Sequence, residues 1–142
     1  MSDDKIKAIY EARLKAWADA NDLPVQFENE RFEPPSAALP EDNIYLQGFQ
    51  LPASTTSADL AGAHRGYRGV FQINVVIPTG IGTGLATPIR AALADLFSTN
   101  LPLTDASGFT VQIVGPLSSG PSLGGDTRLT IPLSFPYRAD VT

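Results

Sequence analysis

Residues 65–98 read RGYRGVFQINVVIPTGIGTGLATPIRAALADLFS, and this stretch decides the fold class. Its first part, 65–77, alternates: every second position from Tyr67 to Ile77 is apolar or glycine, whereas Arg68, Gln72 and Asn74 point to the other side. A strand of a parallel sheet is covered on both faces and carries few such polar side chains. The stretch therefore predicts a long strand in an antiparallel sheet that is covered on one face.

The pattern changes to a helical period over 84–98. An apolar stripe is formed there by Leu85, Ile89, Leu93, Leu96 and Phe97. Such a stripe predicts an amphipathic helix that packs its apolar side on the sheet. Proline is tolerated only in the first turn of a helix, so we expect Thr87 as the N-cap and Pro88 as the first helical residue.

The glycine loop between strand and helix has two interpretations. Gly80, Gly82 and Gly84 precede a helix N-terminus, which is a place where proteins bind phosphate. The spacing GIGTG, however, matches neither G-x-G-x-x-G nor the P-loop with its lysine. Asp105 follows at about the sequence distance of an acidic residue that binds a ribose, but it lies in a loop-like stretch, TDASG. We favour a tight turn, with a phosphate cradle as the alternative.

The elements around this unit complete an α+β domain. Residues 3–20 form an amphipathic helix pattern through Ile6, Ile9, Tyr10, Leu14 and Trp17. Strand patterns cover 24–29, 43–51, 109–114 and 127–135, and loops are expected at 30–42, 52–64 and 115–125. Pro132 places the last strand at an edge or a bulge. We predict one domain over 1–142, with a mainly antiparallel four- to five-stranded sheet and two helices packed on one face.

Charge and composition exclude several classes of protein. Residues 1–42 carry a net charge of −5 and residues 43–142 a net charge of zero, with no basic stripe that would bind nucleic acid. No apolar run is long enough to span a membrane, and the charged start MSDDKIK has no secretory signal pattern. The absence of cysteine excludes disulfides and thiolate metal sites.

Residue patterns for catalysis are missing as well. His64 is the only histidine, so two-histidine metal sites are excluded within one chain. Ser118 and Ser119 lie outside a G-x-S-x-G motif. We therefore predict that the chain is not an enzyme and has no catalytic, metal or cofactor-binding residues. A catalytic pair of carboxylates is the one alternative that the sequence does not exclude.

After residue 42 the basic residues are His64 and arginines alone, and arginine is favoured at protein interfaces. We predict that His64, Arg65, Arg68, Tyr137 and Arg138 contribute to contacts between subunits. The acidic segment 28–42 would complement them in a head-to-tail contact, which forms a ring when the rotation closes. Ordinary surface arginines are the alternative.

Taken in order, several stretches resemble the tail-terminator-like minor tail proteins of long-tailed bacteriophages. They are Trp17, LPVQFENERFEPP (23–35), IYLQ (44–47), RGVFQINVVIPTGIGTG (68–84), the helix with Ile89 and Phe97, and IPLSFPYRADV (131–141). The resemblance implies an α+β fold and a hexameric ring of identical subunits on the end of the tail tube. It implies that the ring ends tube polymerisation and meets the head–tail connector protein, and it brings no catalytic residues.

The resemblance also implies a location in the virion tail, and in the cytoplasm of the bacterial host during assembly. Its partners would be further copies of the chain, the tail tube protein and the connector, without specific binding of nucleic acid and without a membrane. Two alternatives remain: another head–tail connector or tail-completion protein, and a small enzyme that binds a phosphorylated ligand at Gly80–Gly84.

Overall fold

The computed structural model describes residues 2–28, 30–36, 39–53, 55, 65–80, 82–125 and 127–141. In chain order its elements are α1 (Ser2–Ala20), β1 (Val25–Phe27), the 3₁₀ helix η1 (Pro40–Asn43), β2 (Tyr45–Pro52), β3 (Arg65–Pro78), α2 (Ala86–Leu96), β4 (Pro102–Thr104), β5 (Thr110–Ile113), β6 (Ser118–Ser119), β7 (Leu123–Gly124) and β8 (Arg128–Val141). Neither α1 nor α2 combines the length and the hydrophobicity that a membrane-spanning helix needs.

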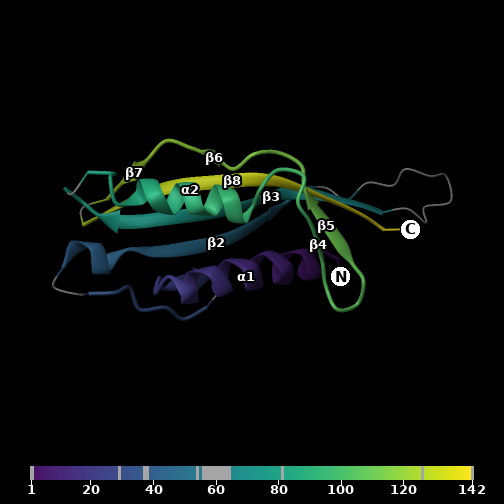
Figure 1. Cartoon of the computed structure of the whole chain (residues 1–142), viewed down its shortest axis with the longest axis horizontal. Helices are drawn as coiled ribbons and strands as arrows, with labels where there is room; N and C mark the ends of the chain where they lie inside the picture. Colours follow the sequence, from purple (N-terminus) through teal and green to yellow (C-terminus); the bar gives the residue numbers. More distant parts are fainter. Residues whose placement is uncertain are drawn as a thin grey trace.

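The sheet is larger than the sequence predicts and is mixed. Its strands lie in the order β1-β2-β3-β8-β5-β4, and the short β6 and β7 also pair with β8. The two long strands β3 and β8 form its centre, as Figure 1 shows, and they are antiparallel along their whole length. The pair β1 and β2 is parallel. The α+β class is confirmed, whereas the expected sheet of four to five mainly antiparallel strands is wrong in size and type. Strands as short as β4, β6 and β7 leave little periodicity to read, and the parallel pairing of β1 with β2 is not a local property of the sequence.

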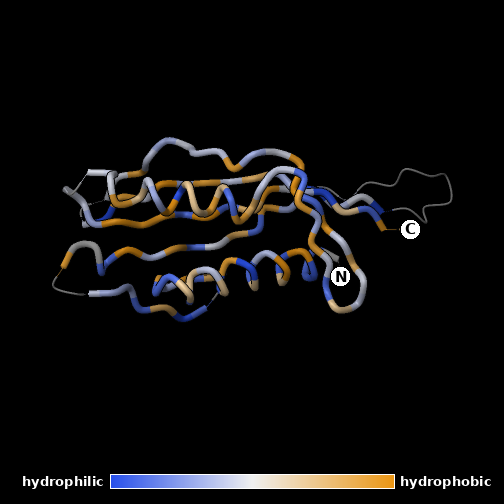
Figure 2. Tube along the Cα trace, viewed as in Figure 1, coloured by the Kyte–Doolittle hydropathy of each residue, from blue (hydrophilic) through white to orange (hydrophobic). Residues whose placement is uncertain are grey.

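Both helices cover the same face of β3 and β8. The predicted apolar side of β3 is confirmed, since Phe71, Ile73, Val75 and Ile77 are all buried on this face. The prediction that only one face is covered is wrong for the second half of the strand, because Asn74 and Val76 on the other face are buried as well. The ring of Tyr10 in α1 lies 6.1 Å from the ring of Phe97, which follows α2. The Arg13 Nε also donates a hydrogen bond of 2.8 Å to the Leu96 carbonyl. The helices therefore form one layer on the sheet, and the hydrophobic stretches of β3 and β8 in Figure 2 are their platform.

The last strand is central, which corrects the prediction of an edge or a bulge at Pro132. Strand β8 runs to Val141 and has β3 on one side and β5, β6 and β7 on the other. The Pro132 carbonyl accepts from the Gly120 amide, and the Pro136 carbonyl accepts from the Val114 amide. Each proline therefore faces a place where the row of short strands is interrupted, so its missing N–H costs no regular ladder hydrogen bond.

Two local predictions are corrected, at the start of α2 and in the loop expected over 115–125, which contains the short strands β6 and β7. The hairpin of β4 and β5 adds a strand that the sequence analysis does not predict. Helix α2 begins at Ala86, so Thr87 is not its N-cap; Pro88 still lies in the first turn, where its missing N–H is harmless. The stretch 102–104 is a strand that pairs with β5 across a turn. The Asp105 Oδ1 accepts from the amides of Ser107 and Phe109 in this turn, which the pattern T-D-A-S-G between two strand-like runs could have indicated.

Candidate subunit interface

Arg68 and Arg138 lie together on the face of the sheet that the helices leave open. They are direct register partners of β3 and β8, and both are exposed. Arg65 is exposed at the start of β3, opposite Val141. Tyr137 points to the helix side and is only 1% exposed, so it belongs to the core of the subunit. His64 lies outside the described residues.

An apolar row crosses the open face beside the two arginines. Leu51 is the register partner of Val70, and Val70 is the partner of Pro136, so the three side chains share one face. The Val114 amide donates to the Pro136 carbonyl and extends the row by one strand. Leu51 is 51% exposed and Val114 is 45% exposed. Val70, Val114 and Pro136 line a groove of about 480 Å³ together with Arg68, Arg138 and Asp140. We call this the arginine groove.

Charge on the groove is only partly balanced within the subunit. The Arg138 Nε donates to the Asp140 Oδ2 at 3.0 Å, in an exposed ion pair. Among the described residues, Arg68 has no carboxylate partner within 4.0 Å, and its register partner is another arginine. Like charges directly opposite each other in a sheet are unfavourable. An acidic group from outside the subunit would therefore be stabilised at Arg68.

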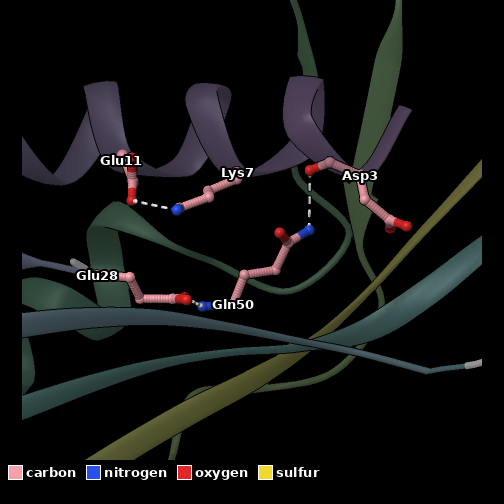
Figure 3. Close-up of polar contacts among 5 residues, drawn as sticks. All are labelled: Asp3, Lys7, Glu11, Glu28 and Gln50. Carbon is pink, nitrogen blue, oxygen red and sulfur yellow. Dashed lines mark hydrogen bonds and ion pairs between the residues drawn. The ribbon is translucent and has the colours of Figure 1, made fainter. Parts of the chain in front are cut away.

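Gln50, next to Leu51 in β2, lies on the helix side of the sheet, and Figure 3 shows its contacts with Glu28 and Asp3. Its backbone amide donates to the Glu28 Oε1 at 2.7 Å, and its Nε2 donates to the Asp3 carbonyl at 3.0 Å. The same Nε2 lies 3.1 Å from the Tyr137 hydroxyl. Burial raises the pKa of Tyr137, so this hydroxyl is protonated at neutral pH. These bonds tie α1, the end of β2 and β8 together directly beneath Leu51.

A carboxylate lies next to this network on α1. Glu11 is within 4.0 Å of Lys7, as Figure 3 shows, and burial raises the pKa of its carboxyl. Lys7 lowers that pKa, whereas Glu30 and Glu28 raise it further.

The segment that precedes β2 packs on the opposite end of the open face. We call residues 30–36 and 39–43 the acidic loop. The sequence predicts little for this loop to pack against, yet the Phe32 ring lies 5.1 Å from the Tyr45 ring. Arg128 donates to the Asn43 carbonyl at 3.0 Å and to the Pro35 carbonyl at 2.9 Å. Its guanidinium also lies over Tyr45, at 5.2 Å from the ring centre. The acidic loop is therefore anchored on both sides of Leu39.

Sequence reasoning missed two features here. One is the role of Arg128, which reaches backbone carbonyls more than eighty positions away in the chain. The other is Leu39, which is 55% exposed and starts η1, since its carbonyl accepts from the Asp42 amide. Exposed Glu33 and Asp42 lie along the same loop, whereas exposed Glu30 lies at its beginning, beside Glu11 and Phe27 on the α1 side. The only available signal was a lone leucine in a run of acids and prolines, because the contacts of Arg128 depend on the folded sheet.

Replacing Arg128 with alanine is expected to loosen the acidic loop and to lower the free energy of unfolding by about 1–3 kcal/mol, because two charge-assisted hydrogen bonds and a cation–π contact are lost. Lysine at this position keeps the charge but not the planar fork, so Arg128→Lys should recover only part of the loss. Urea unfolding measures the free energy, and hydrogen exchange of the Asp42 amide measures the loop.

The matched control is Arg31→Ala, which removes an exposed arginine of the same loop. It should change the free energy of unfolding by less than about 0.5 kcal/mol. Equal effects of the two alanine variants would show that Arg128 does not anchor the loop.

The glycine loop before α2 has the geometry of a turn. Gly80 has a φ of 91° and Gly82 a φ of 73°, values that only glycine adopts without strain. The Asp105 carboxylate, considered above as a ribose ligand, is engaged by its own turn. Both observations support the tight turn over the phosphate cradle. Within the described ranges, no group of three or more histidine, cysteine or acidic residues is placed to hold a metal ion.

Comparison with known proteins shows the family of the chain. A family model described as phage tail terminator protein matches residues 5–137. A solved structure with 43% sequence identity superposes with a TM-score of 0.78, over 100% of this chain and 96% of the other. No curated protein matches the chain. The similarity extends over nearly the whole length, including the acidic loop and the strands of the arginine groove.

Proposed function

Because this chain belongs to the phage tail terminator family, and is thus a structural protein of the phage tail, we propose that it forms a ring on the end of the tail tube. The ring, of six subunits, ends polymerisation of the tube and forms the surface to which the head joins. It assembles in the cytoplasm of the bacterial host and remains in the virion. The match over 5–137 is the observation that carries this proposal.

The mechanism is mechanical and not catalytic. A tail tube grows because each ring presents a surface like the one it has bound, so growth ends when a ring matches the tube on one face only. A sheet with different groups at its two ends suits head-to-tail contacts, which close into a ring when the rotation between subunits allows it. The net charge of −5 favours passage of DNA without adhesion, by like-charge repulsion.

The family match favours a terminator over the other candidate classes. A head–tail connector or a tail-completion protein would also form a ring, but the matching family model describes neither of them. The family is structural, and the turn geometry of Gly80 and Gly82 explains these glycines without a ligand. An enzyme of phosphorylated compounds has no comparable support.

Adding the purified protein to polymerising tail tube protein of the same phage or prophage is expected to stop tube growth. Electron microscopy should show shorter tubes with a ring at one end. Light scattering behind size exclusion should show a species of roughly 90 kDa, six times 15.1 kDa, that grows with concentration.

Order of addition supplies the control for this experiment. Protein added after the tubes have finished growing should cap them without changing their length. Tubes of unchanged length and bare ends in both orders would contradict the proposed function.

A further inference from the structure

The open face of the sheet carries two surfaces that are complementary in charge, and each has an exposed apolar part. The arginine groove has an apolar floor, formed by Val70, Val114 and Pro136, and a rim with Arg68 and Arg138. The acidic loop has the reverse arrangement, with one protruding apolar side chain, Leu39, among exposed carboxylates. An apolar centre with a charged rim is the usual anatomy of a protein interface.

Leu39, at the η1 end of the acidic loop, lies far from the arginine groove of its own chain. The acidic loop ends at Asn43 beside the start of β2, and Leu51 lies near the other end of that strand. Six residue steps along a strand span about 20 Å. Figure 1 shows the same separation, with η1 at one end of the long axis and the C-terminal end of β8 at the other. A neighbouring copy of the chain is thus the partner that can bring the loop to the groove.

We infer that the acidic loop of one subunit docks in the arginine groove of the next, with Leu39 on the apolar row and carboxylates of the loop beside Arg68 and Arg138. The contact is heterologous, since it uses two different surfaces, and it repeats from copy to copy. Arg128 fixes the loop in advance, which lowers the entropy lost on docking. This inference rests on the proposed function, because it names the contact by which the ring closes.

The absence of cysteine makes disulfide cross-linking a direct test. The test variant combines Leu39→Cys with Val114→Cys, and the control combines Leu39→Cys with Leu123→Cys, because Leu123 is 61% exposed outside the groove. A chain with one cysteine can form only dimers, whereas two cysteines in a head-to-tail contact produce a ladder. Mild oxidation of the test variant should give a reducible ladder of covalent multimers, and the control pair should give mainly monomers and dimers.

The cysteine variants are oxidised both alone and when bound to the ends of tail tubes. Light scattering and tube capping are measured in parallel with the wild-type protein. A ladder with the test pair alone supports the docking. Rings or capped tubes without a ladder overturn it and leave the proposed function intact. Tubes that stay uncapped count against the proposed function, and a ladder would still support the contact. If the cysteine of a Val114→Cys variant is protected from a thiol reagent only when tail tube protein is added, the groove binds the tube protein. That result would overturn the contact between copies of the chain.

Charge reversal gives a second, independent measurement. Arg68→Glu should weaken assembly by about tenfold or more, because a carboxylate then faces the carboxylates of the neighbour. Lys15→Glu is the matched control, since it makes the same change in net charge on the exposed surface of α1. Both variants should unfold at similar urea concentrations. Equal weakening of assembly by the two variants would overturn the role of Arg68.

Discussion

Replacing Gly69 with alanine is expected to destabilise the subunit by about 3 kcal/mol or more and to lower the yield of folded protein at growth temperature. A Cβ atom at this position would lie 2.5 Å from the Leu51 carbonyl oxygen and 2.6 Å from the Tyr137 hydroxyl. It would also lie 2.9 Å from the Pro52 Cα. Two of these atoms belong to the backbone of β2, so a side chain cannot rotate away to make room.

The size of the effect follows from the central position of Gly69. It pairs with Pro52 on one side and with Tyr137 on the other, in the middle of three hydrogen-bonded strands. Moving β2 away would break the bonds by which Gln50 holds Tyr137 and α1. Overpacking in a well-packed site costs about 1–3 kcal/mol and sometimes more, against a total stability of about 5–15 kcal/mol.

Urea unfolding and the yield of soluble protein measure this prediction. Gly124→Ala is the control, because a Cβ at that position meets no atom within 4 Å. It should leave the unfolding midpoint nearly unchanged. A Gly69→Ala variant as stable as the control would show that β2 does not approach β3 as closely as described.

Replacing Tyr10 with alanine is expected to cost about 3–5 kcal/mol and to detach α1 from the sheet. The Tyr10 ring lies 5.0 Å from the ring of Phe135 and 5.5 Å from that of Phe71. Phe97 and Tyr137 complete the cluster, at 6.1 Å and 5.8 Å. This single side chain therefore joins both helices and both central strands, and its removal leaves a cavity that the rigid sheet cannot fill.

The matched control is Tyr10→Phe, which keeps the ring and removes the hydroxyl. That hydroxyl is buried and has no hydrogen-bond partner among the described residues, and burial raises its pKa. The phenylalanine variant should therefore be as stable as the wild type or more stable by up to about 1 kcal/mol, since an unpaired buried polar group is lost. Urea unfolding followed by far-ultraviolet circular dichroism compares the two variants. Equal destabilisation by both would mean that the hydroxyl, and not the ring, holds α1.

The helices and the buried face of the sheet could be predicted from the sequence because their signals are local. Alternation from Tyr67 to Ile77 and the helical spacing of Ile6, Tyr10 and Leu14 each lie within a few residues of chain. These patterns depend only on which side of a regular element faces the core, and the structure buries the predicted sides. The resemblance to tail terminators, carried by the order of such stretches, is confirmed by the family match.

The candidate interface could be predicted only in part. Arg68 and Arg138 were named from residue type, and the structure brings them together because they are register partners. Tyr137 was named from its place next to Arg138, but it points to the core, since neighbouring residues of a strand face opposite sides. The apolar row is formed by the pairing of four separate segments, so no local pattern in the sequence indicates it.

The sequence by itself determined the α+β class, the position of both helices and which side of β3 is buried, because these follow from short-range periodicity in hydrophobicity. Tertiary structure alone decided that β8 is central, that Pro132 and Pro136 face interruptions in the neighbouring strands, and that Arg128 anchors the acidic loop. It also decided that the groove and the loop occupy opposite ends of one face. The physical reason is that strand pairing joins residues far apart in the chain, and the free energy of each pairing depends on the whole sheet and not on the residues nearby.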